Sequence, residues 1–298
     1  MGQQPPKMEQ NHLQTELQNA FTQGNFWASL IGLISIFLLT GAVYALVLNL
    51  RRFLRHETKS LPIGAVPVAW NLNLILPIGL FAFVCANLLL FGFNLALTKT
   101  HAEPSFNVQA LKTILYTLVA EISLTFIIFY LLGRRYFGIW QLGLNGWRRE
   151  YLRGGLWTYL SILPVMAIIG AFLGLFRKTL LPEQEIYKIL MGLTSVPVSL
   201  LFLIIVGLIA PLLEEIIFRG FVFGTLRNSF GPGRSMVYSS LLFAALHQSL
   251  VAFLPIFFLA MVLAYLYEKS GSLWPSIILH MANNIVATLF VIFIRKAL

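Results

Sequence analysis

The chain has 298 residues, of which 58% are hydrophobic and 11% are charged, and its formal net charge is +10. Soluble domains contain about 25% charged residues, so this composition excludes an ordinary soluble protein and predicts an all-α, polytopic transmembrane helical bundle. The sequence contains no aspartate, which excludes a paired-Asp protease and a Ser-His-Asp triad. Its single cysteine, Cys85, excludes an intrachain disulfide and a Cys-rich zinc site.

The basic residues cluster in particular loops, as the positive-inside rule expects of a multi-pass membrane protein. No RNA-binding signature accompanies them, so we expect membrane lipid and no nucleic acid as partners. Residues 1–25 are polar and glutamine-rich and are predicted to form a disordered tail. We expect residues 26–153 to hold the N-terminal transmembrane helices and a basic connector, and residues 154–298 to form the core domain.

About eight transmembrane helices are expected when roughly 20 apolar residues are taken as the minimum span. Pro and Gly in the segment from Asn228 to Gly233 predict a turn that ends the fifth helix. The division of residues 234–268 into two short helices is the boundary with the weakest pattern. The expected spans cover residues 26–50, 74–97, 111–132, 154–176, 198–226, 234–248, 251–268 and 274–294.

Two adjacent glutamates, Glu214 and Glu215, lie inside the fifth of these apolar spans, with Arg219 close behind. Each charge near the centre of a bilayer costs roughly 2.5–3.5 kcal/mol on insertion scales, so the cluster needs partners and indicates a use. Glu215 and Arg219 are four residues apart and share a helix face, while Glu214 is rotated by about 100°. One carboxylate is therefore expected to be neutralised by arginine, and the other to be free for proton transfer.

Two further candidates are histidines in later apolar spans. Phe243 and His247 share a helix face, and so do His280 and Asn284. A histidine and an amide on one face are able to donate hydrogen bonds to a developing oxyanion.

The motifs Glu-Glu-x-x-x-Arg, Phe-x-x-x-His and His-x-x-x-Asn, in this order on three helices, resemble those of the CAAX protease and bacteriocin-processing family (CPBP or Abi), which includes the type II CAAX prenyl endopeptidases. The resemblance covers roughly residues 154–294 and implies an intramembrane, glutamic-type endopeptidase. It implies that Glu214 with His247 activates a water and that His280 and Asn284 hold the oxyanion. It further implies that Glu215, Arg219 and Phe243 support the site, and that the substrate is a membrane-associated peptide or protein, prenylated or not.

Several alternatives stay open. The His-Glu-x-x-His zinc signature is absent, and we expect no cofactor, although two histidines and two glutamates would also suit zinc. A non-catalytic protein of bacteriocin self-immunity or scaffolding type and a proton-coupled transporter are the other functional classes. Glu121, in the third span, is interpreted as a structural residue that pairs with Asn87, Asn94 or a loop arginine. We expect the protein in a bacterial plasma membrane, with Glu214, His247, His280 and Asn284 around one water-sized space.

Overall fold

The computed structural model describes residues 105–134, 139–180 and 185–297, together with residues 33, 36–37, 39–48 and 51 and isolated positions between 68 and 92. Within these residues the regular elements are helical. The predicted tail, residues 1–25, lies outside the described part, as do about half of the first predicted span and most of the second. The domain boundaries predicted at residues 26, 153 and 154 stay predictions.

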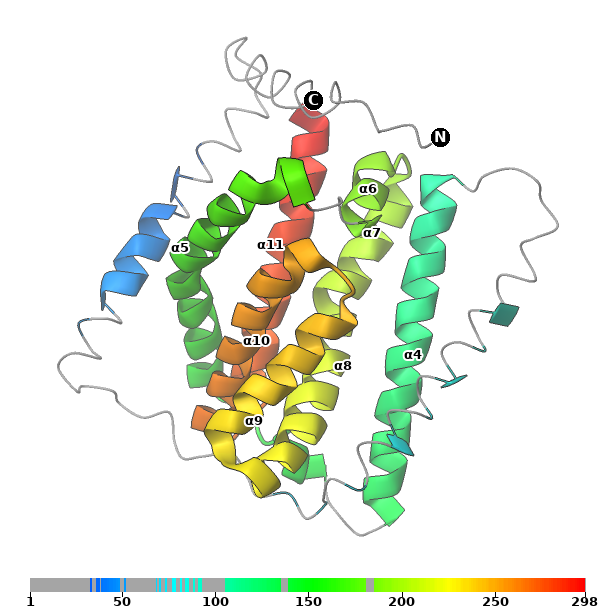
Figure 1. Ribbon diagram of the computed structural model, residues 1–298, viewed down its shortest axis with the longest axis vertical. Helices are drawn as coiled ribbons and strands as arrows, with labels where there is room; N and C mark the ends of the chain where they lie inside the picture. The colour runs from blue at the N-terminus through cyan, green and yellow to red at the C-terminus, as the bar shows by residue number, and fades with distance from the viewer. Residues whose placement is uncertain are drawn as a thin grey trace.

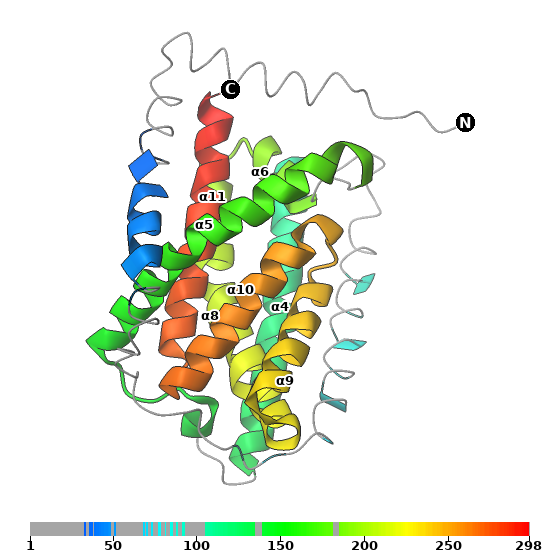
Figure 2. The ribbon, with the colours of Figure 1, turned by 60° about the vertical axis from the view of Figure 1, so that its left-hand side comes forward.

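The long helices pack against one another as a bundle. Figure 1 shows α4 at one side of the bundle and α5 at the other, with α9 and α10 in front of α11, and Figure 2 shows the same helices after a turn of 60°. Helix α10 packs on α9, and α11 packs on α5. The helices are α4 (Phe106–Arg134), α5 (Arg149–Leu180), α6 (Glu185–Gly192), α7 (Val196–Ile204), α8 (Ala210–Glu215), α9 (Gly224–Leu246), α10 (Leu250–Ser270) and α11 (Trp274–Ala297).

Two π-helical segments flank α8: η3 (Ile205–Ile209) and η4 (Ile216–Phe223). Proline at the start of α8 explains part of this geometry. The N–H of Ala210 reaches back five residues to the carbonyl of Ile205, and Pro211 has no N–H to donate. The wide turns place the two adjacent glutamates at a junction between α and π geometry, and π segments of this kind are frequent at functional sites.

Helix α9 is broken at Gly231, whose φ of 74° and ψ of 169° are open to glycine but strained for other residues. After this kink the chain returns along η4, as shown by the 4.8 Å between the ring centroids of Phe218 and Phe243. The predicted turn between Asn228 and Gly233 is therefore present.

Five segments among the described residues are long and apolar enough to cross a membrane. One of them, Val196–Leu246, contains both the fifth and the sixth predicted spans, and a shorter apolar helix, Leu39–Leu48, lies within the first. The prediction of an all-α, multi-pass integral membrane protein is confirmed, whereas the count of about eight is not.

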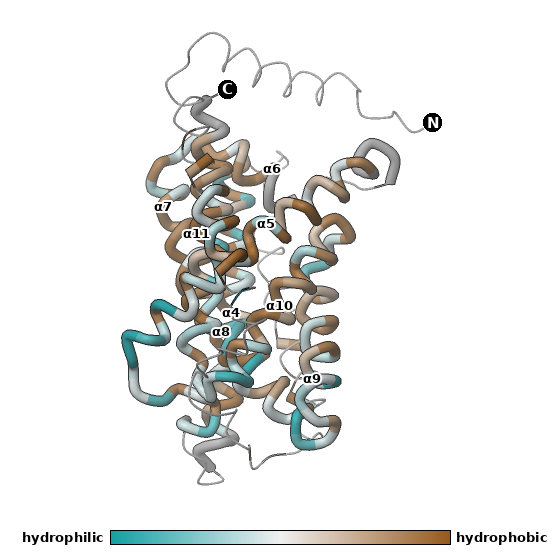
Figure 3. Tube along the Cα trace, turned by 90° about the vertical axis from the view of Figure 1, so that its left-hand side faces the viewer, coloured by the Kyte–Doolittle hydropathy of each residue, from teal (hydrophilic) through white to brown (hydrophobic). Residues whose placement is uncertain are grey.

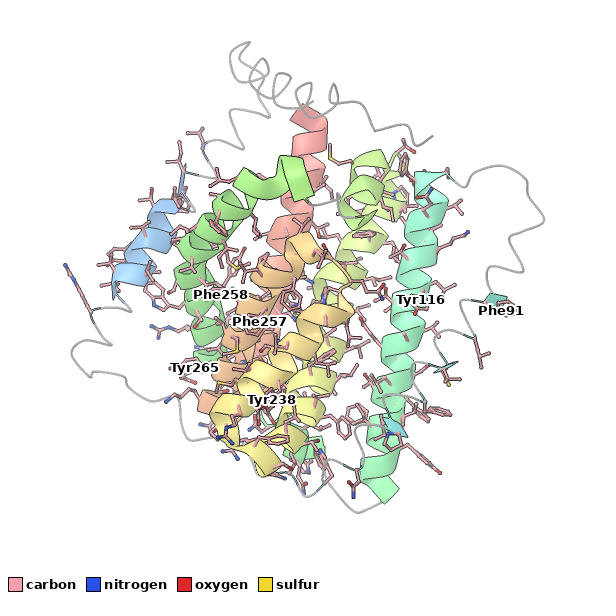
Figure 4. The ribbon with its side chains drawn as sticks, in the orientation of Figure 1. Phe91, Tyr116, Tyr238, Phe257, Phe258 and Tyr265 are labelled. Carbon is pink, nitrogen blue, oxygen red and sulfur yellow. The ribbon has the colours of Figure 1, made fainter. Side chains whose placement is uncertain are left out.

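Hydrophobic residues follow most of the length of the long helices (Figure 3), and many of them face outward. Tyr238 on α9 and Tyr265 on α10 are about half exposed, and both lie in the lower half of the view in Figure 4. In the same pair of helices Arg227 binds Glu268 with two hydrogen bonds, of 2.6 and 2.9 Å. Apolar outer faces with tyrosines and ion pairs towards one end are the arrangement expected of helices that cross a bilayer.

Candidate active site

A buried ion pair forms the centre of the site. Arg219 donates from Nη1 to Oε1 of Glu215 over 2.8 Å, and both side chains are almost completely buried. The nitrogen Nδ1 of His280, which comes from α11, lies 2.9 Å from the same carboxylate oxygen. One oxygen of Glu215 therefore joins a cation of η4 to an imidazole of α11.

Arg219 is held on three sides. Besides its bond to Glu215, its Nη2 donates to the backbone carbonyl of Ala260 on α10 over 3.3 Å. Its guanidinium carbon lies 4.5 Å from the ring centroid of Phe243, a cation–π contact with a ring that is itself buried. A charge so deep in the protein is expected to be paired and hydrogen-bonded, and this one is both.

Glu214 faces the other nitrogen of the same imidazole. Its Oε2 lies 3.5 Å from Nε2 of His280. The side chain of Glu214 is 18% exposed, whereas those of Glu215 and His280 are 0% and 3% exposed. Of the two glutamates, Glu214 is the one that a water molecule and a substrate are able to reach.

His247 lies at the end of α9 and is exposed. Because a carbonyl oxygen only accepts, Nδ1 of His247 donates to the carbonyl of Phe243, 2.8 Å away. In the neutral ring this leaves Nε2 with a free lone pair, the form that acts as a base. The ring of Phe243 separates the two histidines, with centroid distances of 4.7 Å to His247 and 5.8 Å to His280.

Asn284 is bound to the backbone of η3. Its Nδ2 donates to the carbonyl of Val206 over 3.0 Å, and its Oδ1 accepts a 3.2 Å hydrogen bond from Asn283. The Val206 carbonyl needs this donor because Ala210 bonds Ile205 instead. The second N–H of the Asn284 amide remains available for another acceptor.

Glu121 comes to the site from α4. Its carboxyl lies near that of Glu214, and its Oε2 is buried without a hydrogen-bond partner in the described part of the chain. The interpretation of Glu121 as a partner of Asn87, Asn94 or a loop arginine stays a prediction, because both asparagines lie outside the described residues. The sequence signal for a place of Glu121 in the site was its position, because an ionisable residue inside an apolar span is functional by default.

The structure thus brings Glu214, Glu215, Arg219 and Phe243 together around the imidazole of His280. His247 lies on the other side of the Phe243 ring. Asn284 is one helical turn from His280 but bonds elsewhere. No hydrogen bond joins His247 to Glu214 in the described residues. Within the same residues no three His, Cys, Asp or Glu side chains are arranged to hold a metal ion.

Residues 196–286 match a family model described as type II CAAX prenyl endopeptidase Rce1-like. This segment contains all three motifs, from Glu214 to Asn284. The fold, with five segments among the described residues that are long and apolar enough to cross a membrane, defines a multi-pass integral membrane protein. The match over residues 196–286 confirms the resemblance predicted from the motifs.

Curated bacterial proteins are also similar to this chain. A putative membrane peptidase, YdiL, of Bacillus subtilis is 28% identical over 145 residues, which are 46% of this chain and 59% of that protein. The membrane-embedded CAAX protease MroQ of Staphylococcus aureus is 31% identical over 124 residues, 39% of this chain and 48% of that protein. A UPF0177 protein, YxdF, of Lactococcus lactis is 33% identical over 82 residues, 27% of this chain and 45% of that protein. The chain thus spans about half the length of the curated relatives it matches, and no solved structure matches it.

Proposed function

We propose that the protein is an intramembrane endopeptidase in which Glu214 activates a water molecule for attack on a peptide carbonyl. The observation that carries this proposal is the unequal environment of the two adjacent glutamates. Glu215 is fully buried and bound by Arg219, whereas Glu214 is partly exposed beside the same imidazole. Environments that differ in this way give two carboxylates different tasks.

In the proposed reaction, Glu214 takes a proton from water while the water oxygen attacks the carbonyl carbon. His247, whose Nε2 is free, assists as a second base near the open end of α9. His280 and the second N–H of Asn284 stabilise the negative charge on the tetrahedral oxygen. Collapse breaks the C–N bond, and the proton on Glu214 passes to the leaving amine, so that the carboxylate is regenerated.

Glu215, Arg219 and Phe243 act through His280. The ion pair fixes the imidazole from one side, and the face of the phenyl ring limits its motion from another. A substrate oxygen would therefore meet a donor whose position is set before binding, which is the basis of electrostatic preorganisation.

For the substrate we propose a membrane-associated peptide, because the site lies on apolar helices and its family is that of CAAX proteases. Whether a prenyl chain contributes is tested by comparing one peptide with and without the lipid. A lower KM for the lipidated peptide at equal kcat would show that the prenyl chain is bound uniformly in ground and transition states.

The test uses the full chain in lipid nanodiscs and a fluorogenic peptide that partitions into the bilayer. Glu214→Gln removes the base and is expected to lower kcat about a hundred- to ten-thousandfold. Glu268→Gln is the matched control, since Glu268 is also a glutamate in a long helix but pairs with Arg227 outside the site. Activity is measured before and after chelation, together with metal content.

Wild-type rates in Glu214→Gln and in His247→Ala would contradict the proposal. They would favour the non-catalytic alternative of a self-immunity or scaffolding protein, provided that both variants keep the helical content and the thermal stability of the wild type.

A further inference from the structure

We propose that Gln248, the residue after His247, binds the peptide substrate, and that its side-chain amide forms hydrogen bonds with the backbone of that peptide. The inference rests on the proposed function, in which His247 acts on the same peptide. Gln248 lies within the segment that matches the family model but outside the three motifs.

The backbone of Gln248 has an unusual conformation. Its φ of 51° lies in the left-handed region, where no other residue except glycine is found in the described part of the chain. The turn around it is tight, because the Gln248 N–H donates to the carbonyl of Ala245 over 3.1 Å and Ser249 caps α10 by accepting from the N–H of Ala252. Glycine would adopt this φ without strain, and strained residues cluster at active sites and ligand-binding sites.

The turn between α9 and α10 lies at the depth of the reaction centre. The ring of Phe243 lies 5.8 Å from that of His280, so α9 and α11 are nearly level at these two residues. Short connections make α9 antiparallel to α10 and α10 antiparallel to α11, so α9 and α11 point the same way (Figure 2). His247, one turn after Phe243, is therefore about level with Asn284, in the middle of the apolar segment Trp274–Phe293.

A polar turn at this depth requires water. His247 and Gln248 are exposed, and the side-chain amide of Gln248 has no hydrogen-bond partner among the described residues. Irregular backbone within the hydrocarbon region is tolerated where protein buries it or where it lines a water-filled cavity, because lipid tails supply no hydrogen bonds. Both side chains are exposed rather than buried, so the turn lines a hydrated recess beside the reaction centre.

The chemistry of Gln248 suits the backbone of a peptide. Its amide has two N–H donors and a carbonyl acceptor, and each peptide unit offers one N–H and one C=O. An amide also carries no charge that a bound substrate would have to strip of water. Leu246 and Leu250, which are 57% and 76% exposed, flank the polar pair and offer apolar contacts to the side chains of the same peptide. The position next to His247 places these contacts near the scissile bond.

Two substitutions separate the side chain of Gln248 from its backbone. Gln248→Gly removes the amide and relieves the strain, so this variant should keep or raise the thermal stability of the wild type. Gln248→Met keeps the length of the side chain but not its hydrogen bonds. Both should raise KM about three- to thirtyfold and keep kcat within about threefold, because a contact made equally in ground and transition states affects KM alone. Gln109→Met, near the start of α4, is the matched control and should leave KM unchanged.

Peptide binding is also measured without turnover, in the Glu214→Gln background, by the fluorescence anisotropy of a labelled peptide in nanodiscs. Adding Gln248→Gly should raise Kd by the same factor as KM, whereas adding Gln109→Met should not. An unchanged Kd on adding Gln248→Gly overturns the inference, whether or not the wild type cleaves the peptide. A wild type that cleaves nothing, but whose peptide binding is weakened by Gln248→Gly, would refute the proposed function and leave Gln248 as a peptide-binding residue. Peptide binding too weak to measure in the wild type would overturn both.

The hydrated recess has a readout of its own. Cys85→Ala removes the single native thiol, and Gln248→Cys then places one thiol in the turn. A thiol reacts as the thiolate, which forms in water and not among lipid tails. Gln248→Cys should therefore react with a water-soluble maleimide about tenfold faster, or more, than Ile168→Cys, whose side chain is 69% exposed on an apolar segment of α5. Equal rates at the two positions would show that the turn faces lipid and would overturn the inference.

Discussion

Asn284 of α11 donates its side-chain amide to the backbone carbonyl of Val206 in η3 over 3.0 Å, and so supplies a hydrogen bond that Pro211 is unable to make. The residue expected to stabilise an oxyanion thus also joins α11 to the helix that carries the glutamates. Ile285, the next residue, packs against Gly207, where an added Cβ would lie 3.0 Å from its side chain.

The hydrogen bond between Asn284 and Val206 predicts that Pro211→Ala partly compensates for the loss of stability in Asn284→Ala. Asn284→Ala should destabilise the protein by about 1–3 kcal/mol, because the partly buried carbonyl of Val206 loses its donor. Pro211→Ala restores an N–H near Val206, so the cost of Asn284→Ala should be smaller in the Pro211→Ala background. Thermal unfolding of the wild type, the two single variants and the double variant in one detergent measures this coupling. An equal loss of stability on Asn284→Ala in both backgrounds would contradict it.

The ion pair of Arg219 and Glu215 should show a second coupling. Arg219→Ala leaves the fully buried carboxylate of Glu215 with one partner fewer, and should cost about 3–5 kcal/mol of stability. Adding Glu215→Gln to Arg219→Ala removes the stranded charge and should recover part of that loss. A double variant less stable than Arg219→Ala alone would show that Glu215 is held mainly by His280.

Two glycines of α5 form a matched pair for testing the packing of α5 on α11. A Cβ on Gly155 would lie 2.7 Å from the backbone carbonyl of Pro275 and 2.9 Å from Ile278, whereas Gly170 has open space. Gly155→Ala should therefore destabilise the protein by about 1–3 kcal/mol through overpacking. Gly170→Ala should be neutral or stabilising by up to about 1 kcal/mol, because alanine favours helix. Equal midpoints of thermal unfolding for the two variants would contradict this view of the interface.

The kink in α9 provides a further test. Gly231 has a φ of 74° with no atom near its absent side chain, so Gly231→Ala should cost about 1–3 kcal/mol through backbone strain alone. Gly233→Ala, two residues later, meets neither a neighbour nor a positive φ and should be close to neutral. Hydrogen exchange along α9 would show whether the strain is confined to the turn, as expected, or spreads towards Phe243.

Much of the fold follows from local pattern. The long apolar stretches predict α4, α5, α10 and α11 to within a few residues, because a bilayer demands helices of a minimum length. The turn at Gly231 is predicted by its Pro and Gly neighbours. The spacing of Glu215 and Arg219 predicts their ion pair, which depends only on contacts within one helix.

Features that depend on packing between helices are less well predicted from the sequence. A helical wheel assumes 3.6 residues per turn, and the π segments around Glu214 depart from it, so the faces of Val206 and Phe221 are not given by spacing alone. The position of His280 between two carboxylates, and of Glu121 beside Glu214, requires the docking of α11 and α4. No periodicity within one helix encodes that docking.

Among the described residues, helix α10 contributes to the centre through the backbone carbonyl of Ala260, which accepts from Arg219. Every amino acid carries such a carbonyl, so the bond survives replacement of the side chains around it. The outward surface of α10 is therefore free to adapt to acyl chains of different length and saturation, or to other helical neighbours, without altering the electrostatics of the candidate site.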